Sequence, residues 1–172
     1  MTNDEVDHNV DHNIVEIWLR RDQKRWIAGA ITGLLAALIM FFAVVVASLF
    51  TQGIDKFYLI RVFALPIVGR DAMNLSLGAG ALLPGFALFG FLSVILGVVY
   101  AHMTGTNNMK ALCGVGLTWG LFSWIFISNL FSPSFRLIHV ENISPIKALG
   151  AWLIFGFSLT LIRWIDPLVR GD

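Results

Sequence analysis

A run of 24 residues without a charged side chain, Ile27–Phe50, most strongly limits how this chain can fold. A helix rises about 1.5 Å per residue, so this run is about 36 Å long as a helix and exceeds the roughly 30 Å hydrocarbon core of a bilayer. Apolar runs of this length are typical of transmembrane helices, because helices of soluble proteins keep a polar face. We therefore predict that residues 27–50 cross a membrane.

Three further apolar stretches are predicted to cross the membrane, at about residues 77–101, 111–131 and 146–165. The uncharged core of the last stretch, Ala148–Ile162, has only 15 residues, so Lys147 and Arg163 are expected to extend toward the two interfaces. Composition supports this, because only 13% of the residues are charged, against about 25% in soluble domains. The prediction is an all-α polytopic membrane protein with four transmembrane helices in one domain, residues 27–172.

Two shorter helices are predicted outside the spans. Residues 1–26 are predicted to form a polar tail followed by an amphipathic helix on the membrane surface, since apolar residues recur at helical spacing from Val10 onward. In the loop after the first span, residues 57–66 are apolar but too short and too charged to cross. We expect an interfacial or re-entrant helix there, ended by Pro66.

The distribution of basic residues predicts the orientation. If the N-terminus is cytoplasmic, seven basic residues flank the spans on the inside and five on the outside. The inner set is Arg20, Arg21, Lys24, Arg25, Lys110, Arg163 and Arg170, and the outer set is Lys56, Arg61, Arg70, Arg136 and Lys147. Because cytoplasmic loops carry the excess of Lys and Arg, both termini are expected in the cytoplasm.

Glycines four residues apart mark two of the spans. Gly29 and Gly33 in the first span, and Gly116 and Gly120 in the third, form small-residue faces that let helix backbones approach closely. We expect these faces to pack against partner helices. The second and fourth spans also share the tripeptide Phe-Gly-Phe, at residues 89–91 and 155–157. These matches suggest two helical hairpins descended from one, with the long outer loop inserted into the first.

Ionisable side chains are missing from the centres of the spans, which contain no Asp, Glu, Lys or His there. Proton-coupled carriers, haem proteins and membrane metalloenzymes need such groups, so we predict a protein that is no enzyme and has no cofactor of its own. A net charge of +1 also argues against nucleic-acid binding. His8 and His12, four residues apart in the polar tail, are weak candidates for metal binding.

Two further features predict contacts rather than chemistry. Pro84 is expected to kink the second span and to serve packing against a neighbouring helix. On the third span, bulky aromatic residues are candidates for contact with lipid, or with a quinone or pigment bound by a partner. These residues are Trp119, Phe122, Trp124 and Phe126.

Three short motifs carry a resemblance to a known group of proteins. They are Gly29–Ala37, Gly97–Tyr100 and Gly116–Leu121. With these motifs, the chain resembles small four-helix inner-membrane proteins of unknown function that are found in many bacteria. The resemblance covers roughly residues 27–165, and it implies a four-helix fold and no catalytic residue.

These observations favour a non-catalytic accessory subunit of a larger inner-membrane complex of respiratory, photosynthetic or membrane-oxygenase type. Its expected partners are other integral membrane subunits and membrane lipids. The alternative is a small homo-oligomeric channel or carrier for a neutral or apolar solute, with Pro84 and Asn129 near its path. A third hypothesis is an enzyme acting on lipids through His139 and Glu141 in the last outer loop.

Overall fold

The computed structural model describes residues 22–50, 55–106, 108–127 and 145–171, and this described part is helical without a strand. Four of its segments are long and apolar enough to cross a membrane, namely Gln23–Leu49, Leu82–Met103, Met109–Phe126 and Ile146–Arg170. The prediction of an all-α chain with four candidate spans is therefore confirmed.

The helical elements follow one another along the chain with short 3-10 turns between some of them. They are α2 (Gln23–Leu49), α3 (Tyr58–Val68), η1 (Gly69–Met73), η2 (Leu75–Leu77), α4 (Ala79–Met103), α5 (Met109–Phe126), α7 (Pro145–Ser158), η5 (Leu159–Leu161) and α8 (Ile162–Arg170). Helix α2 begins at Gln23, so residues 23–26 continue into the first span instead of forming a separate surface helix. Residues 1–21, which hold the rest of the expected surface helix, lie outside the described residues.

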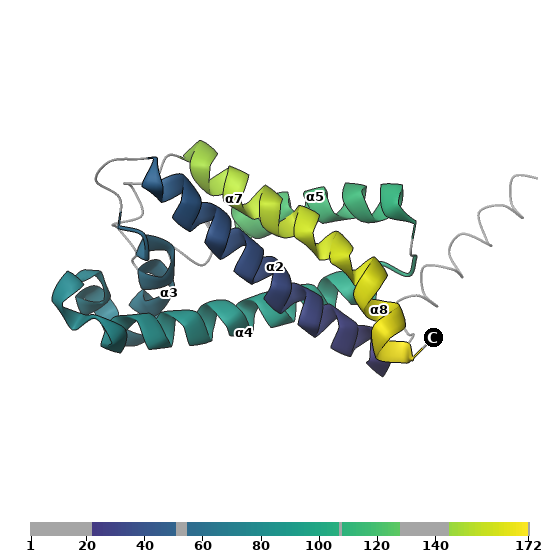
Figure 1. Cartoon of the computed structure of the whole chain (residues 1–172), viewed down its shortest axis with the longest axis horizontal. Helices are drawn as coiled ribbons and strands as arrows, with labels where there is room; N and C mark the ends of the chain where they lie inside the picture. Colours follow the sequence, from purple (N-terminus) through teal and green to yellow (C-terminus); the bar gives the residue numbers. More distant parts are fainter. Residues whose placement is uncertain (1–21, 51–54, 107, 128–144, 172) are drawn as a thin grey trace, which may run out of the picture.

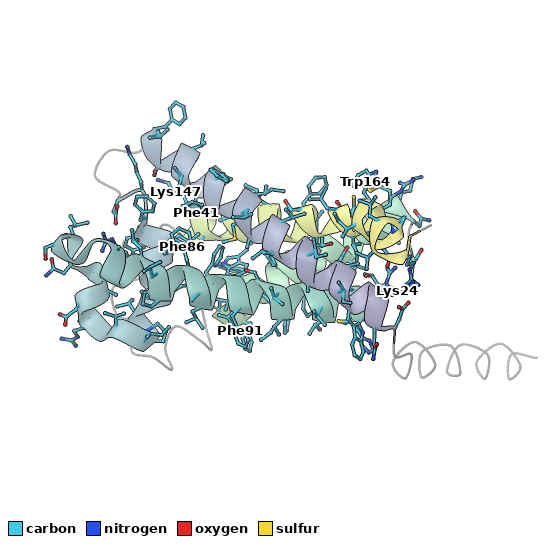
Figure 2. The ribbon with its side chains drawn as sticks, turned by 60° about the horizontal axis from the view of Figure 1, so that its bottom comes forward. Lys24, Phe41, Phe86, Phe91, Lys147 and Trp164 are labelled. Carbon is cyan, nitrogen blue, oxygen red and sulfur yellow. The ribbon has the colours of Figure 1, made fainter. Side chains whose placement is uncertain are left out.

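Helix α2 lies at the centre of the described bundle (Figure 1). It packs against α4 on one side and against α7 and α8 on another, while α5 packs mainly against α7. Helix α3 lies against α4, at the end of the bundle away from the C-terminus. Figure 2 shows Lys24 at one end of the bundle and Lys147 at the other, as expected for basic residues that flank membrane spans.

Helices α2 and α4 are in closest contact where three glycines meet. A Cβ atom on Gly97 of α4 would lie 2.3 Å from the carbonyl oxygen of Gly29 and 2.7 Å from the Cα atom of Gly33. Non-bonded carbon atoms in ordinary contact are about 3.5–4.0 Å apart, so no side chain fits at this position. The two helices therefore meet backbone to backbone, as small-residue interfaces allow.

Helices α5 and α7 repeat this arrangement. A Cβ atom on Gly156 of α7 would lie 2.2 Å from the carbonyl oxygen of Gly116 and 2.8 Å from the Cα atom of Gly120. The three glycines of the first hairpin thus correspond, in order and in contact, to the three glycines of the second. The first hairpin differs by its longer connection, which contains α3.

This correspondence corrects the sequence analysis in two respects. Gly90, which the Phe-Gly-Phe match pairs with Gly156, has only the Leu34 side chain near its Cβ position, at 3.7 Å. The residue that corresponds to Gly156 is Gly97, because both glycines lie at a helix crossing that leaves no room for a side chain. The phenylalanines next to Gly90 and Gly156 are not needed for such a crossing. The glycine faces, moreover, lie against helices of this chain, so they are not open to a partner as we expected.

Residue size explains why α2 is central and α5 is peripheral. Ala28 and Thr32 of α2, each one residue before a glycine of the pair, are fully buried. The corresponding positions of α5 hold Val115, which is 37% exposed, and Trp119, which is partly buried. Small residues let a second helix approach closely, and bulky ones keep it away. Of these two helices, α2 can therefore pack closely on two sides and α5 cannot.

Helix α3 docks on the first part of α4. A Cβ atom on Gly85 of α4 would lie 2.1 Å from the carbonyl oxygen of Ile60, so the two backbones touch here as well. The expectation that Pro66 ends this helix is wrong, because the helix continues through it to Val68. It ends where Gly69 adopts a positive φ of 73°, a conformation that glycine tolerates and that stops helices.

The charge of the buried Arg61 of α3 is neutralised within the segment that joins α2 to α4. Its Nε atom donates to the Asp55 carboxylate at 2.7 Å, and its Nη1 atom donates to the carbonyl oxygens of Ala72 and Asn74, each at 3.1 Å. A buried guanidinium is tolerated when it is paired and hydrogen-bonded in this way. Arg61 thereby holds the start of α3 to the turn that leads into α4.

Candidate functional site

A cluster of four charged residues ties the ends of three helices together where α2 begins and α8 ends. These residues, named the charged cluster below, are Asp22, Arg25, Asp166 and Arg170. At its centre the Nη1 atom of Arg25 donates to Oδ2 of Asp166 at 2.9 Å. Arg25 is only 9% exposed and Asp166 only 3% exposed, so this ion pair is almost fully removed from solvent.

Arg25 also satisfies carbonyl groups at the C-terminus of α4 and in the loop that follows it. Its Nε atom donates to the carbonyl oxygen of Ala101 at 3.1 Å, and its Nη2 atom donates to those of Thr104 and, at 3.2 Å, Thr106. The carbonyls at a helix C-terminus lack partners inside the helix and carry partial negative charge. A guanidinium from α2 is therefore a suitable cap for α4, and it fixes how these two helix ends sit together.

The remaining members close the charged cluster. Arg170 donates from Nε to Oδ1 of Asp166 at 3.1 Å and from Nη2 to Oδ2 of Asp22. The other oxygen of Asp22 accepts the backbone N–H of Arg25 at 3.1 Å, which caps the N-terminus of α2. Two carboxylates and two guanidinium groups thus alternate, and the formal charges of the cluster balance.

The charged cluster forms part of the wall of an open pocket of about 580 Å³, named the charged pocket below. Trp26 and His102 also line it, and the indole N–H donates to Nδ1 of His102 at 3.3 Å. The wall is completed by the loop after α4 and by apolar side chains that include Met103 and Val115. This volume falls in the range of pockets that bind small ligands.

The aromatic residues expected on the third span divide into two groups on α5. Trp119, Phe122 and Phe126 form a stacked row, with ring centroids 5.3 Å and 6.2 Å apart. Phe122 is 51% exposed, so the middle of this row faces outward. Trp119 and Trp124 both pack against the buried core of the chain. On the same helix the buried atoms Trp119 Nε1 and Ser123 Oγ have no hydrogen-bond partner among the described residues.

The other residues that the sequence analysis selected are placed as follows. Pro84 lies in the second turn of α4, which continues through it to Met103. His8 and His12, Asn129, and His139 and Glu141 lie outside the described residues. Within the described ranges, no group of three His, Cys, Asp or Glu side chains could hold a metal ion.

Sequence reasoning did not find the charged pocket. It used Arg25 and Arg170 to assign orientation, and it gave no role to His102 or Asp166. One signal was present, because Asp166 is the only acidic residue between Glu141 and the terminal Asp172. A lone carboxylate at the end of an apolar helix needs a basic partner, but the sequence does not say which one.

Fold and site together define an all-α chain with four helices able to span a membrane and a charged pocket at one end of the bundle. Comparison of the chain with protein-family models, with curated proteins and with solved structures gives no match. The resemblance to small four-helix bacterial proteins stays a prediction.

Proposed function

We propose that the chain is a multi-pass protein of a bacterial inner membrane and serves there as a non-catalytic accessory subunit of a larger complex. The four apolar helices support a membrane location. In this arrangement α5 contacts another integral membrane subunit, or a lipid, quinone or pigment that this subunit holds. The chain contributes packing surface and brings no cofactor of its own.

The proposed orientation places both termini in the cytoplasm. The start of α2 and the end of α8 meet at one end of the bundle, where Asp22 and Arg170 are in contact (Figure 1). Basic residues near this end exceed those near the other, which supports a cytoplasmic location for it. Helix α3 then lies at the opposite face, as an interfacial or re-entrant helix.

The observation that carries the proposed function is that α5 is weakly apolar and is also poorly covered by the other helices. Among the four candidate spans as the structure describes them, α5 is the least apolar, yet it is covered by the rest of the chain no better than α4. It also exposes Thr118 beside the aromatic row, and the hydroxyl of Thr118 donates to the carbonyl oxygen of Gly114 in the same helix at 3.0 Å. A weakly apolar helix gains less from contact with lipid tails than a strongly apolar one, and polar residues such as threonine are typical of contacts between membrane helices.

Photo-crosslinking in native membranes tests this proposal. Phe122 is replaced by the photoreactive residue p-benzoylphenylalanine, and Phe91 on α4 is replaced in the same way as a matched control. Both phenylalanines are strongly exposed, at 51% and 62%, and Figure 2 shows Phe91 pointing away from the bundle. After irradiation the chain is purified and its adducts are identified by mass spectrometry.

We expect one discrete protein adduct at position 122 and lipid adducts at position 91. Lipid adducts alone at position 122, or the same adducts at both positions, would contradict the proposed contact. Mass spectrometry of the gently extracted complex then identifies the partner and any quinone or pigment that it carries.

A further inference from the structure

The charged pocket lies at one end of the candidate membrane spans, which the proposed membrane location places at the level of the phospholipid headgroups. It opens at the ends of α2, α4 and α8, all of which belong to candidate spans. Trp26, in the first turn of α2, contributes its ring to the wall. Tryptophan side chains are enriched at this depth, because the ring is apolar and its N–H group is polar.

The charges of the pocket suit a ligand that carries both signs. Asp22 offers carboxylate oxygens, each of which can accept more than one hydrogen bond, whereas Asp166 is only 3% exposed and is paired with Arg25 and Arg170. Arg170 uses two of its N–H groups toward these carboxylates in the described part of the chain, and a guanidinium has five. Because the acidic and basic residues balance, a bare anion gains little net attraction here, whereas a phosphate joined to an ammonium group matches both.

An apolar track leads out of the pocket along α4. Met103 lines the pocket, and Val99 and Ile95 precede it by four and eight residues, so the three side chains share one face of the helix. They are 45%, 38% and 41% exposed, respectively. This track gives an acyl chain a continuous surface from the pocket toward the middle of the span.

We propose that the charged pocket binds the headgroup of a zwitterionic phospholipid of the phosphoethanolamine type. The phosphate lies toward Arg170, the ammonium lies toward Asp22, the ring of Trp26 flanks the headgroup, and an acyl chain follows the track from Met103 to Ile95. This inference rests on the membrane location proposed above, but it does not require a partner at α5.

Lipid binding to the purified full-length chain tests the site. The chain is freed of lipid by detergent washing and titrated with palmitoyl-oleoyl phosphatidylethanolamine, and bound lipid is counted by native mass spectrometry. Phosphatidylglycerol, phosphatidylcholine, free phosphoethanolamine and inorganic phosphate are titrated in parallel. We expect phosphatidylethanolamine to bind about tenfold more tightly than phosphatidylglycerol, since the ammonium adds a charge-assisted hydrogen bond.

Each competitor separates one part of the proposal. Phosphatidylcholine is expected to bind more weakly than phosphatidylethanolamine, because its trimethylammonium group has no N–H to donate. Equal or tighter binding of phosphatidylglycerol would overturn the zwitterionic assignment. Free phosphoethanolamine or inorganic phosphate that binds as tightly as the lipid would show that the ligand is a soluble compound and would overturn the lipid assignment.

A matched pair of variants locates the binding. Arg170→Gln is expected to weaken phosphatidylethanolamine binding by about tenfold, whereas Arg163→Gln, the same change at an exposed residue of α8, is expected to leave it within about twofold. Equal losses in the two variants would overturn the location.

A second variant keeps the test decisive if Arg170→Gln does not fold. Trp26→Phe leaves the four residues of the charged cluster in place. It reduces the ring that lines the pocket and removes the hydrogen bond to His102, with an expected loss of affinity of about threefold. Unchanged affinity in Trp26→Phe, in a chain that keeps its helical circular dichroism, would overturn the pocket assignment. The lipid titration uses the purified chain without other subunits. A negative result in the titration therefore does not change what the crosslinking at Phe122 shows.

Discussion

The crossing of α2 and α4 at Gly97 gives the sharpest prediction, because one methyl group is enough to disturb it. In Gly97→Ala the new Cβ atom would lie 2.3 Å from the carbonyl oxygen of Gly29. The helices must then separate by about 1 Å to restore ordinary contact. Gly90→Ala on the same helix is the matched control, since its Cβ atom would meet only the Leu34 side chain, at 3.7 Å.

The magnitude follows from two opposing effects. Overpacking a tight interface costs about 1–3 kcal/mol, and a gap of about 1 Å loses up to half of the dispersion attraction across it. Alanine, on the other hand, stabilises a helix by about 0.5–1 kcal/mol relative to glycine. We expect Gly97→Ala to lower the free energy of unfolding by about 2 kcal/mol and Gly90→Ala to raise it by up to about 1 kcal/mol.

Unfolding of the purified chain by sodium dodecyl sulfate in mixed micelles measures both values, with the fluorescence of the six tryptophans as the signal. The second hairpin provides an independent repeat of the experiment. Gly156→Ala should destabilise, whereas Gly150→Ala, where nothing lies within 4 Å of the Cβ position, should not. Equal shifts in the midpoint for Gly97→Ala and Gly90→Ala would refute the close backbone crossing.

Three further changes test the polar contacts. Arg25→Gln leaves Asp166 with Arg170 as its remaining partner and removes the cap of α4. The free energy of unfolding should therefore fall by about 3 kcal/mol in the same assay, and an unchanged value would refute the buried pair. Arg61→Gln should speed amide hydrogen exchange in α3 and η1 while α5 and α7 keep wild-type rates, and uniform acceleration would argue against a local role. Ser123→Ala should stabilise the chain by about 1 kcal/mol, because the buried Ser123 hydroxyl has no partner among the described residues. The control Ser93→Ala loses a hydrogen bond to the Phe89 carbonyl and should bring no gain in stability.

The spans were predictable because the property that defines them is local. An uncharged run such as 27–50 is apolar wherever its neighbours lie, and the structure places a helix at Gln23–Leu49. The close-packing role of Gly29 and Gly33 was equally visible, since glycines four residues apart share one face of a helix. Even the correspondence between the first and third spans could be read from these spacings.

The partners of those faces were not predictable. Gly97 lies 64 positions after Gly33, and its neighbours in the sequence do not distinguish it from Gly90. In the structure, however, the Cβ position of Gly90 meets only a side chain. The expectation of partner subunits at the glycine faces failed for the same reason. A small-residue face indicates that another backbone approaches closely, but it does not identify the helix to which that backbone belongs.

The sequence by itself determined a helical chain with four apolar spans and glycine faces on two of them. The tertiary structure decided which helix is central, where α3 docks and where the charges meet. Arg25 and Asp166 are 141 residues apart, and their pairing depends on the start of α2 lying beside α8. Hydropathy and residue spacing act along one helix, whereas the choice of a neighbour depends on surfaces that form only when the helices pack together.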